Sequence, residues 1–183
     1  MILALVYVAV LASALLAGGK LSALADLDLR RSWLALAAIL VQIGVISVLP
    51  GGSHLLHTGL HLLSYGLLGA FAWSNRRLAG VPVVALGGLL NFTAIVANHG
   101  VMPTSPAAAA SLAHTTRAGD FANSAVQAHP HLLFLGDTIP TPASWPIHNV
   151  FSIGDLVILL GAAILVHVAC GSRLGRLGRP ALA

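Results

Sequence analysis

The stretch that decides the predicted fold runs from His54 to Trp73 and reads HLLHTGLHLLSYGLLGAFAW. It carries no formal charge, and about 20 apolar residues is the length that an α-helix needs to cross a bilayer. Polar side chains recur in it every three or four residues, so they share one helical face. They are His54, His57, Thr58, His61, Ser64 and Tyr65. The stretch therefore predicts a transmembrane helix with one polar face.

Four further stretches have the same apolar character and a similar length, and Asp155 is their one formal charge. They are residues 1–17, 33–49, 78–97 and 151–169. With residues 54–73 they predict an all-α membrane protein of five transmembrane helices, in which residues 1–183 form a single integral membrane domain. A long outer loop, residues 100–150, separates the fourth helix from the fifth.

The composition supports this class. Hydrophobic residues make up 57% of the 183 residues and charged residues 8%, and the mean hydropathy is +0.92. These values exclude an ordinary soluble domain and a disordered chain, which needs abundant charge. Cys170 is the single cysteine, so a disulfide scaffold is excluded as well.

The basic residues predict an orientation. Eight of the nine lie in three alternate connections, after the first, third and fifth stretches: Lys20, Arg30, Arg31, Arg76, Arg77, Arg173, Arg176 and Arg179. Basic side chains stay on the cytoplasmic side, so we expect the N-terminus outside and a cytoplasmic tail, residues 170–183. This spread follows topology and forms no patch, so we expect the lipid bilayer as a partner and no nucleic acid.

The outer loop contains two local signals. Pro106 and the four alanines after it, preceded by Thr104 or Ser105 as the first residue, are typical of a helix start. The apolar run from His131 to Leu135 precedes a turn and predicts a return onto the helical bundle.

His57 and His61 are the candidate metal ligands. One helix presents residues four apart on one face, and imidazole suits Zn, Cu, Fe and Ni. The competing interpretation is that His57 lies near the surface and that His61 hydrogen-bonds to a neighbouring helix. No further ligand accompanies the pair at a recognised spacing, so we expect no cofactor, with a metal or haem as the alternative.

Two asparagines and two aspartates are the other candidate ligand-binding residues. Asn91 and Asn98 lie seven residues apart, near Gly87 and Gly88, and an amide beside small residues either bridges two helices or contacts a ligand. Ser152 and Asp155 fit a capping box, in which each side chain bonds the other's backbone N–H, although a carboxylate inside a membrane is also a functional candidate. Asp137 fits a turn, and the predicted topology places it on the same side as Asn98 and Asp155.

Four short motifs carry a family resemblance: Gly18 to Ser22, Asn98-x-Gly100-x-Met102-Pro103, Leu135-Gly136-Asp137-Thr138-Ile139-Pro140, and Phe151-Ser152-Ile153-Gly154-Asp155. Their order and spacing resemble a family of small multi-pass membrane proteins of unknown function from actinobacteria and other Gram-positive bacteria. The resemblance implies a protein of the bacterial cytoplasmic membrane and implies no activity. His99 and Val101 depart from the pattern.

Three functions remain open on these observations. The first is a non-enzymatic accessory protein or small-ligand or lipid-binding protein, with a polar site at the outer mouth of the bundle and with other membrane subunits or a second copy as partners. The second is a metal or haem redox protein that uses His57 and His61. The third is a small proton-coupled carrier, in which Asp155 titrates.

Overall fold

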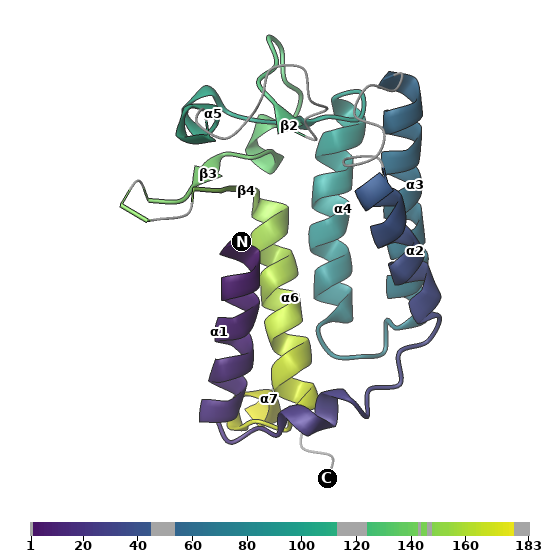
Figure 1. Ribbon diagram of the computed structural model, residues 1–183, viewed down its shortest axis with the longest axis vertical. Helices are drawn as coiled ribbons and strands as arrows, with labels where there is room; N and C mark the ends of the chain where they lie inside the picture. Colours follow the sequence, from purple (N-terminus) through teal and green to yellow (C-terminus); the bar gives the residue numbers. More distant parts are fainter. Residues whose placement is uncertain (1, 45–53, 113–123, 143, 146–147, 178–183) are drawn as a thin grey trace.

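The computed structural model describes residues 2–44, 54–112, 124–142, 144–145 and 148–177. Most of this part belongs to five longer helices, which are α1 (Ile2–Leu16), α2 (Ser32–Ile43), α3 (His54–Ser74), α4 (Val81–Ala97) and α6 (Ile153–Ala169). In Figure 1, α1, α6 and α4 stand side by side and α2 overlaps α3. Each helix packs on the next in the order α1, α6, α4, α3, α2, and the most extensive packing joins α4 to α6.

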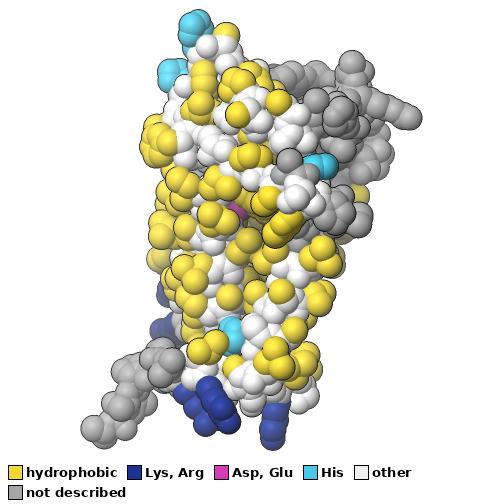
Figure 2. Space-filling model, turned by 90° about the vertical axis from the view of Figure 1, so that its left-hand side faces the viewer, with side chains coloured by type: hydrophobic (Ala, Val, Ile, Leu, Met, Phe, Trp, Pro, Cys, Tyr) yellow, Lys and Arg dark blue, Asp and Glu magenta, His cyan; other side chains and the backbone are white. Residues whose placement is uncertain are grey.

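Short elements close the two ends of this row. One end, which we call the basic end, carries η1 (Leu21–Leu24) and α7 (Arg173–Leu177), and Lys and Arg side chains gather there (Figure 2). The opposite end, which we call the strand end, carries α5 (Pro106–Leu112) and η3 (Leu133–Leu135). Two pairs of short strands lie there too: β1 (Met102–Pro103) is parallel to β2 (Ser124–Ala125), and β3 (Ile139–Pro140) is antiparallel to β4 (Val150–Phe151).

The prediction of transmembrane helices is wrong. Within the described residues, no helix is both long enough and apolar enough to cross a membrane. At a rise of about 1.5 Å per residue, α1, α2, α4 and α6, with 15, 12, 17 and 17 residues, fall short of about 30 Å of hydrocarbon. The 21 residues of α3 are interrupted by histidines and hydroxyl side chains.

This finding also overturns the predictions that depended on it. It contradicts the five spans, the location in the bacterial cytoplasmic membrane, and the orientation with the N-terminus outside and the C-terminus in the cytoplasm. That residues 1–183 form a single domain stays a prediction. The helices themselves begin close to the predicted starts of the apolar stretches. The largest displacement is that of α4, which begins at Val81 and not at residue 78. Residues 45–49 of the second stretch and 178–183 of the tail lie outside the described residues.

The packing encloses polar side chains. Large apolar side chains are exposed on the flanks of the helices (Figure 2), among them Val8, Leu40 and Leu160. The apolar core is a small group at the strand end, in which Ala94, Ile95 and Met102 contact Leu62, Tyr65 and Leu135. The buried polar residues include His57, His61, Ser64, Asn91, Asn98, Thr104, Ser152 and His167.

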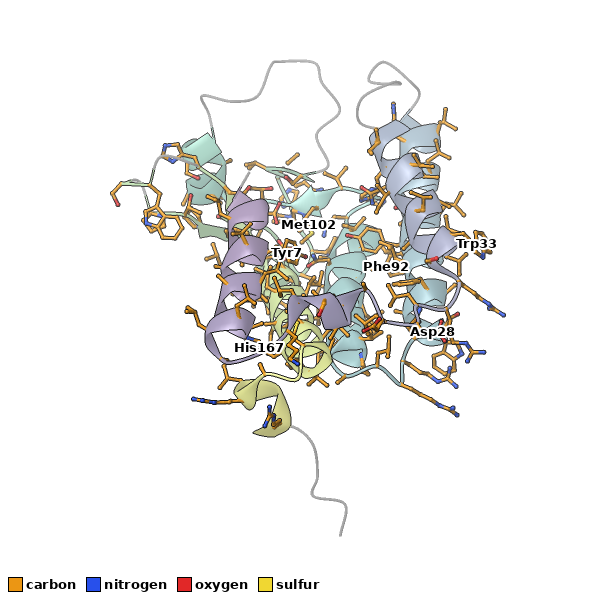
Figure 3. All side chains as sticks on the ribbon, turned by 60° about the horizontal axis from the view of Figure 1, so that its bottom comes forward. Tyr7, Asp28, Trp33, Phe92, Met102 and His167 are labelled. Carbon is orange, nitrogen blue, oxygen red and sulfur yellow. The ribbon has the colours of Figure 1, made fainter. Side chains whose placement is uncertain are left out.

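His167 joins three elements at the basic end (Figure 3). Its Nε2 lies 3.1 Å from Ser13 Oγ of α1, and its Nδ1 lies 2.8 Å from Ser172 Oγ, directly before α7. Both ring nitrogens therefore have partners, and the histidine holds α1, α6 and α7 together.

Candidate functional site

The start of α6 forms the capping box that the sequence predicts. Asp155 N–H donates to Ser152 Oγ, and Ser152 N–H donates to Asp155 Oδ2, each at 3.0 Å. Ser152 is extended, with φ −95° and ψ 167°, and fully buried. The two side chains satisfy backbone N–H groups that a helix start otherwise leaves unpaired.

Asn91 of α4 completes this arrangement from the neighbouring helix. Its Nδ2 donates to Asp155 Oδ1 at 2.8 Å, and its Oδ1 accepts from Ser152 Oγ at 2.8 Å. The close approach needs Gly154, because an added Cβ there would collide with Asn91 Oδ1 and lie 2.7 Å from Gly87 O. Asn91 thus bridges α4 and α6 and holds the Asp155 carboxylate in a fixed position.

Asn98, at the end of α4, fastens the return segment to the bundle. Its Oδ1 accepts from His131 N–H at 2.8 Å, and its Nδ2 donates to His131 O and to Ala94 O, both at 2.7 Å. The side chain is 2% exposed. The hydrogen-bonding groups of Asn98 are therefore engaged with backbone, and the predicted return of residues 131–135 onto the bundle is confirmed.

Asp137 pairs with Thr104, the residue after β1, on the edge opposite β2. Thr104 pairs with Asp137 as an isolated parallel bridge, Asp137 N–H donates to Pro103 O at 2.9 Å, and Ser105 N–H donates to Asp137 O at 3.1 Å. The backbones meet this closely because position 136 is glycine, since a Cβ there would collide with Pro103 O.

The ladder decides where the Asp137 side chain points. Successive residues of a strand face opposite sides and paired residues face the same side, so Met102, Thr104, Ser124 and Asp137 share one face. Met102 belongs to the apolar core with Ala94 and Ile95 of α4 (Figure 3). The Asp137 carboxyl therefore points into the bundle, toward the start of α6.

Electrostatic interactions connect three side chains at this end of the bundle. The pKa of the Asp137 carboxyl is raised from 3.8 to about 6, chiefly by burial, while a hydrogen bond with Ser124 opposes the shift and the Asp155 charge adds to it. Burial also raises the pKa of Tyr65 to about 12, with smaller contributions from Asp155 and Asp137. We call Tyr65, Asp137 and Asp155 the carboxyl cluster.

The histidines of α3 lie beside the carboxyl cluster. His57 and His61 are 1% and 5% exposed, and the His61 ring meets the Tyr65 ring edge-on at 5.3 Å. His61 Nε2 is buried and has no hydrogen-bond partner in the part of the chain that the structure describes, and burial lowers the pKa of this histidine. Among the described residues, no group of three or more His, Cys, Asp or Glu side chains could hold a metal ion, so the metal candidates gain no further ligand.

The structure thus brings Asn91, Asn98, Asp137 and Asp155 to one end of the bundle, with His57 and His61 on the adjoining helix. Sequence reasoning missed two members of the site. Thr104 follows Pro103 in one motif, and Ser124 has no local signal, because it reaches Asp137 through strand pairing alone.

The three motifs of the strand end belong to one set of contacts. Pro103 of the first bonds Asp137 of the second, and Thr138 N–H donates to Phe151 O of the third at 3.2 Å. A family of unknown function, DUF5317, matches residues 26–167. The chain belongs to the DUF5317 family. Searches of curated proteins and of solved structures find no significant match.

The DUF5317 match includes every residue of the strand-end site and leaves out α1 and α7. The family has no assigned function, so the match establishes the family and no activity.

Proposed function

We propose that this DUF5317 protein is a non-enzymatic small-ligand-binding protein, and that the carboxyl cluster at the strand end binds a small organic cation. The observation that carries the proposal is the pairing of Asp137 with Asp155. The Asp155 charge raises the free energy of the Asp137 carboxylate, and no positively charged side chain of the described residues acts on the pKa of Asp137. A bound cation would supply the positive charge that balances the Asp137 and Asp155 carboxylates.

The neighbouring side chains favour an ammonium group over a metal ion. Thr104 Oγ1 is buried, has no hydrogen-bond partner among the described residues, and shares a face with Asp137, so it offers an acceptor beside the carboxylate. Tyr65 and Phe92, with ring centroids 5.6 Å apart, offer aromatic faces, which attract organic cations. A metal ion would need more ligands than the cluster supplies.

The two alternative functions have less support. A redox protein would need a complete ligand set around His57 and His61, and a proton-coupled carrier depended on the membrane spans that the structure contradicts. Neither has an observation of its own, so the ligand-binding function is the one that we carry forward.

Calorimetric titration of the full chain with methylammonium and tetramethylammonium chloride tests the proposal, with sodium chloride at equal ionic strength as the reference. We expect saturable binding at pH 7.5 that Asp137→Asn weakens at least about tenfold, because a hydrogen bond to a charged partner contributes about 1.5–3 kcal/mol. Below about pH 6 protonation of Asp137 competes, so binding weakens.

Asp28→Asn is the matched control, because it makes the same charge change at an exposed position outside the site. It should bind the ammonium ions like the unaltered chain. Equal heats for sodium and both ammonium ions, or an affinity that Asp137→Asn leaves unchanged, would contradict the proposal.

A further inference from the structure

A pocket lies at the basic end, opposite the carboxyl cluster. Its volume is about 220 Å³, and it lies between the start of α2 and the end of α3. It is lined by Arg30, Arg31, Trp73, Ser74 and Arg76, and we call it the arginine pocket. Figure 3 looks onto this end and labels Asp28 and Trp33 on the same side of the molecule.

The backbone of the arginine pocket is held by a buried side chain. Asn75, 3% exposed, accepts from Arg30 N–H at 2.8 Å and donates to Arg30 O at 2.9 Å, and the same amide donates to Phe71 O at 2.9 Å. This clamp fixes the Arg30 and Arg31 turn against α3. The Arg30 and Arg31 turn and α3 therefore stay at a fixed separation when no ligand is bound.

Arg31 has a backbone conformation that is unusual for its type. Its φ of 56° lies in the left-handed region, and it precedes α2 without a side-chain cap. N–H groups of the first turn of α2 therefore point out of the helix start, where the helix dipole favours an anion. Arg31 itself stands at this helix start, although glycine or asparagine adopts its backbone conformation more readily.

The charge of the arginine pocket is positive and unbalanced. Arg76 stacks on the Trp73 ring at 4.5 Å from its centroid and donates from Nη1 to Trp73 O at 2.8 Å, which holds its guanidinium at the rim. Asp26 and Asp28 are nearby in the chain, but in the described residues neither forms an ion pair with these arginines. Three arginines thus line one cavity.

We infer that the arginine pocket binds a phosphate group, carried by a small molecule or by a lipid headgroup. Guanidinium forks match phosphate oxygens in pairs, and a helix start adds N–H donors. The pocket is larger than inorganic phosphate, and it is smaller than the pockets of drug-sized ligands, which begin at about 300 Å³. The Trp73 side chain, 70% exposed, provides a flat apolar surface for the group that carries the phosphate.

Calorimetry with glycerol 3-phosphate tests the inference on the full chain, with chloride at equal ionic strength as the reference. We expect saturable binding that weakens at least about tenfold in Arg31→Asn and in Arg76→Gln. Asparagine tolerates the left-handed conformation, so Arg31→Asn keeps the turn. Arg173→Gln, an exposed arginine of α7, is the control for the loss of one positive charge and should bind normally.

Sedimentation with phosphatidate-containing vesicles, compared with phosphatidylcholine vesicles, distinguishes the two sources. Binding of glycerol 3-phosphate assigns a soluble ligand, and pocket-dependent binding to the phosphatidate vesicles alone assigns a headgroup. Binding in neither assay, or an equal loss in Arg173→Gln and Arg31→Asn, overturns the inference. Circular dichroism of each variant verifies that it is folded.

Discussion

Asp137 shows how one side chain acquires its chemistry from distant parts of the chain. Its backbone is held by the bridge with Pro103 and Thr104, and its carboxyl is hydrogen-bonded by Ser124 and repelled by Asp155. These partners come from three separate parts of the chain. The raised pKa is therefore a property of the assembled strand end.

This pKa predicts a dependence of stability on pH. Its value in the folded protein, about 6, is higher than the ordinary 3.8, so the folded state binds the proton more tightly than the unfolded state. The stabilisation of the folded state that comes from protonated Asp137 is fully present below about pH 4 and is lost as the pH rises through about 6. Since one pKa unit corresponds to about 1.4 kcal/mol, the loss is at most about 3 kcal/mol, and partial exposure reduces it.

Urea unfolding at pH 4.5 and pH 7.5 measures this loss. Asp137→Asn should be more stable relative to the unaltered chain at pH 7.5 than at pH 4.5, and Asp28→Asn should show no such difference. Asp155→Asn should lower the pKa of Asp137, because it removes one of the charges that raise it, although burial remains. A relative stability of Asp137→Asn that is the same at both pH values would rule out this account.

Local spacing predicts some residue roles, and long-range contacts decide the others. The capping box of Ser152 and Asp155 is visible in the sequence because both partners lie within one helical turn. Asn98 stands out there as a polar residue in an apolar stretch, but its partner His131 lies far along the chain. A single sequence holds no signal for such a pairing when the partner contributes its backbone.

At the scale of elements, glycines align α4 with α6. An added Cβ at Gly80 would collide with Gly161 O, and one at Gly87 would lie 2.5 Å from Gly154 O. Gly80 and Gly87 are seven residues apart, as are Gly154 and Gly161, so they recur on one face after about two turns. This row allows the two backbones to approach and brings Asn91 within reach of Asp155.

The adjacent pair Gly87 and Gly88 provides a matched test. Gly87→Ala should lower the free energy of unfolding by about 1–3 kcal/mol, because the new methyl group has no space against Gly154 and Ile158. Gly88→Ala should raise it by up to about 1 kcal/mol, since nothing lies within 4 Å and alanine favours a helix. Chemical denaturation measures both. Equal effects of the two substitutions would show that the row of glycines does not determine the packing.

The helices of this protein are easier to predict from its sequence than its short strands or the environment that surrounds the protein. The apolar stretches place the starts of the five longer helices well, because helix formation depends on nearby residues. The inference from apolar length to a membrane crossing fails, since α1, α4 and α6 are a few residues shorter than their apolar stretches and α3 is interrupted by polar side chains. The two-residue strands escape prediction because they are too short to show an alternating pattern.

At the scale of the whole molecule, the two proposed sites lie at opposite ends of the bundle. The 17 residues of α4 separate them by about 25 Å, which exceeds the screening length of about 8 Å at physiological ionic strength. Arg31→Asn should therefore leave the pKa of Asp137 unchanged. A carboxyl-detected NMR titration of both proteins measures this, with Asp155→Asn as the variant that does shift it. A shift in Arg31→Asn comparable to that of Asp155→Asn would indicate coupling between the ends.

The strand ladder also has a consequence for how the chain length of this protein can vary. Pro103 pairs with Ala125, so the segment between them leaves and re-enters the fold at neighbouring points. The entropy of closing such a loop grows only with the logarithm of its length, and doubling it costs about 0.6 kcal/mol. Lengthening the chain between Pro103 and Ala125 should therefore cost the pairing of β1 with β2 little free energy.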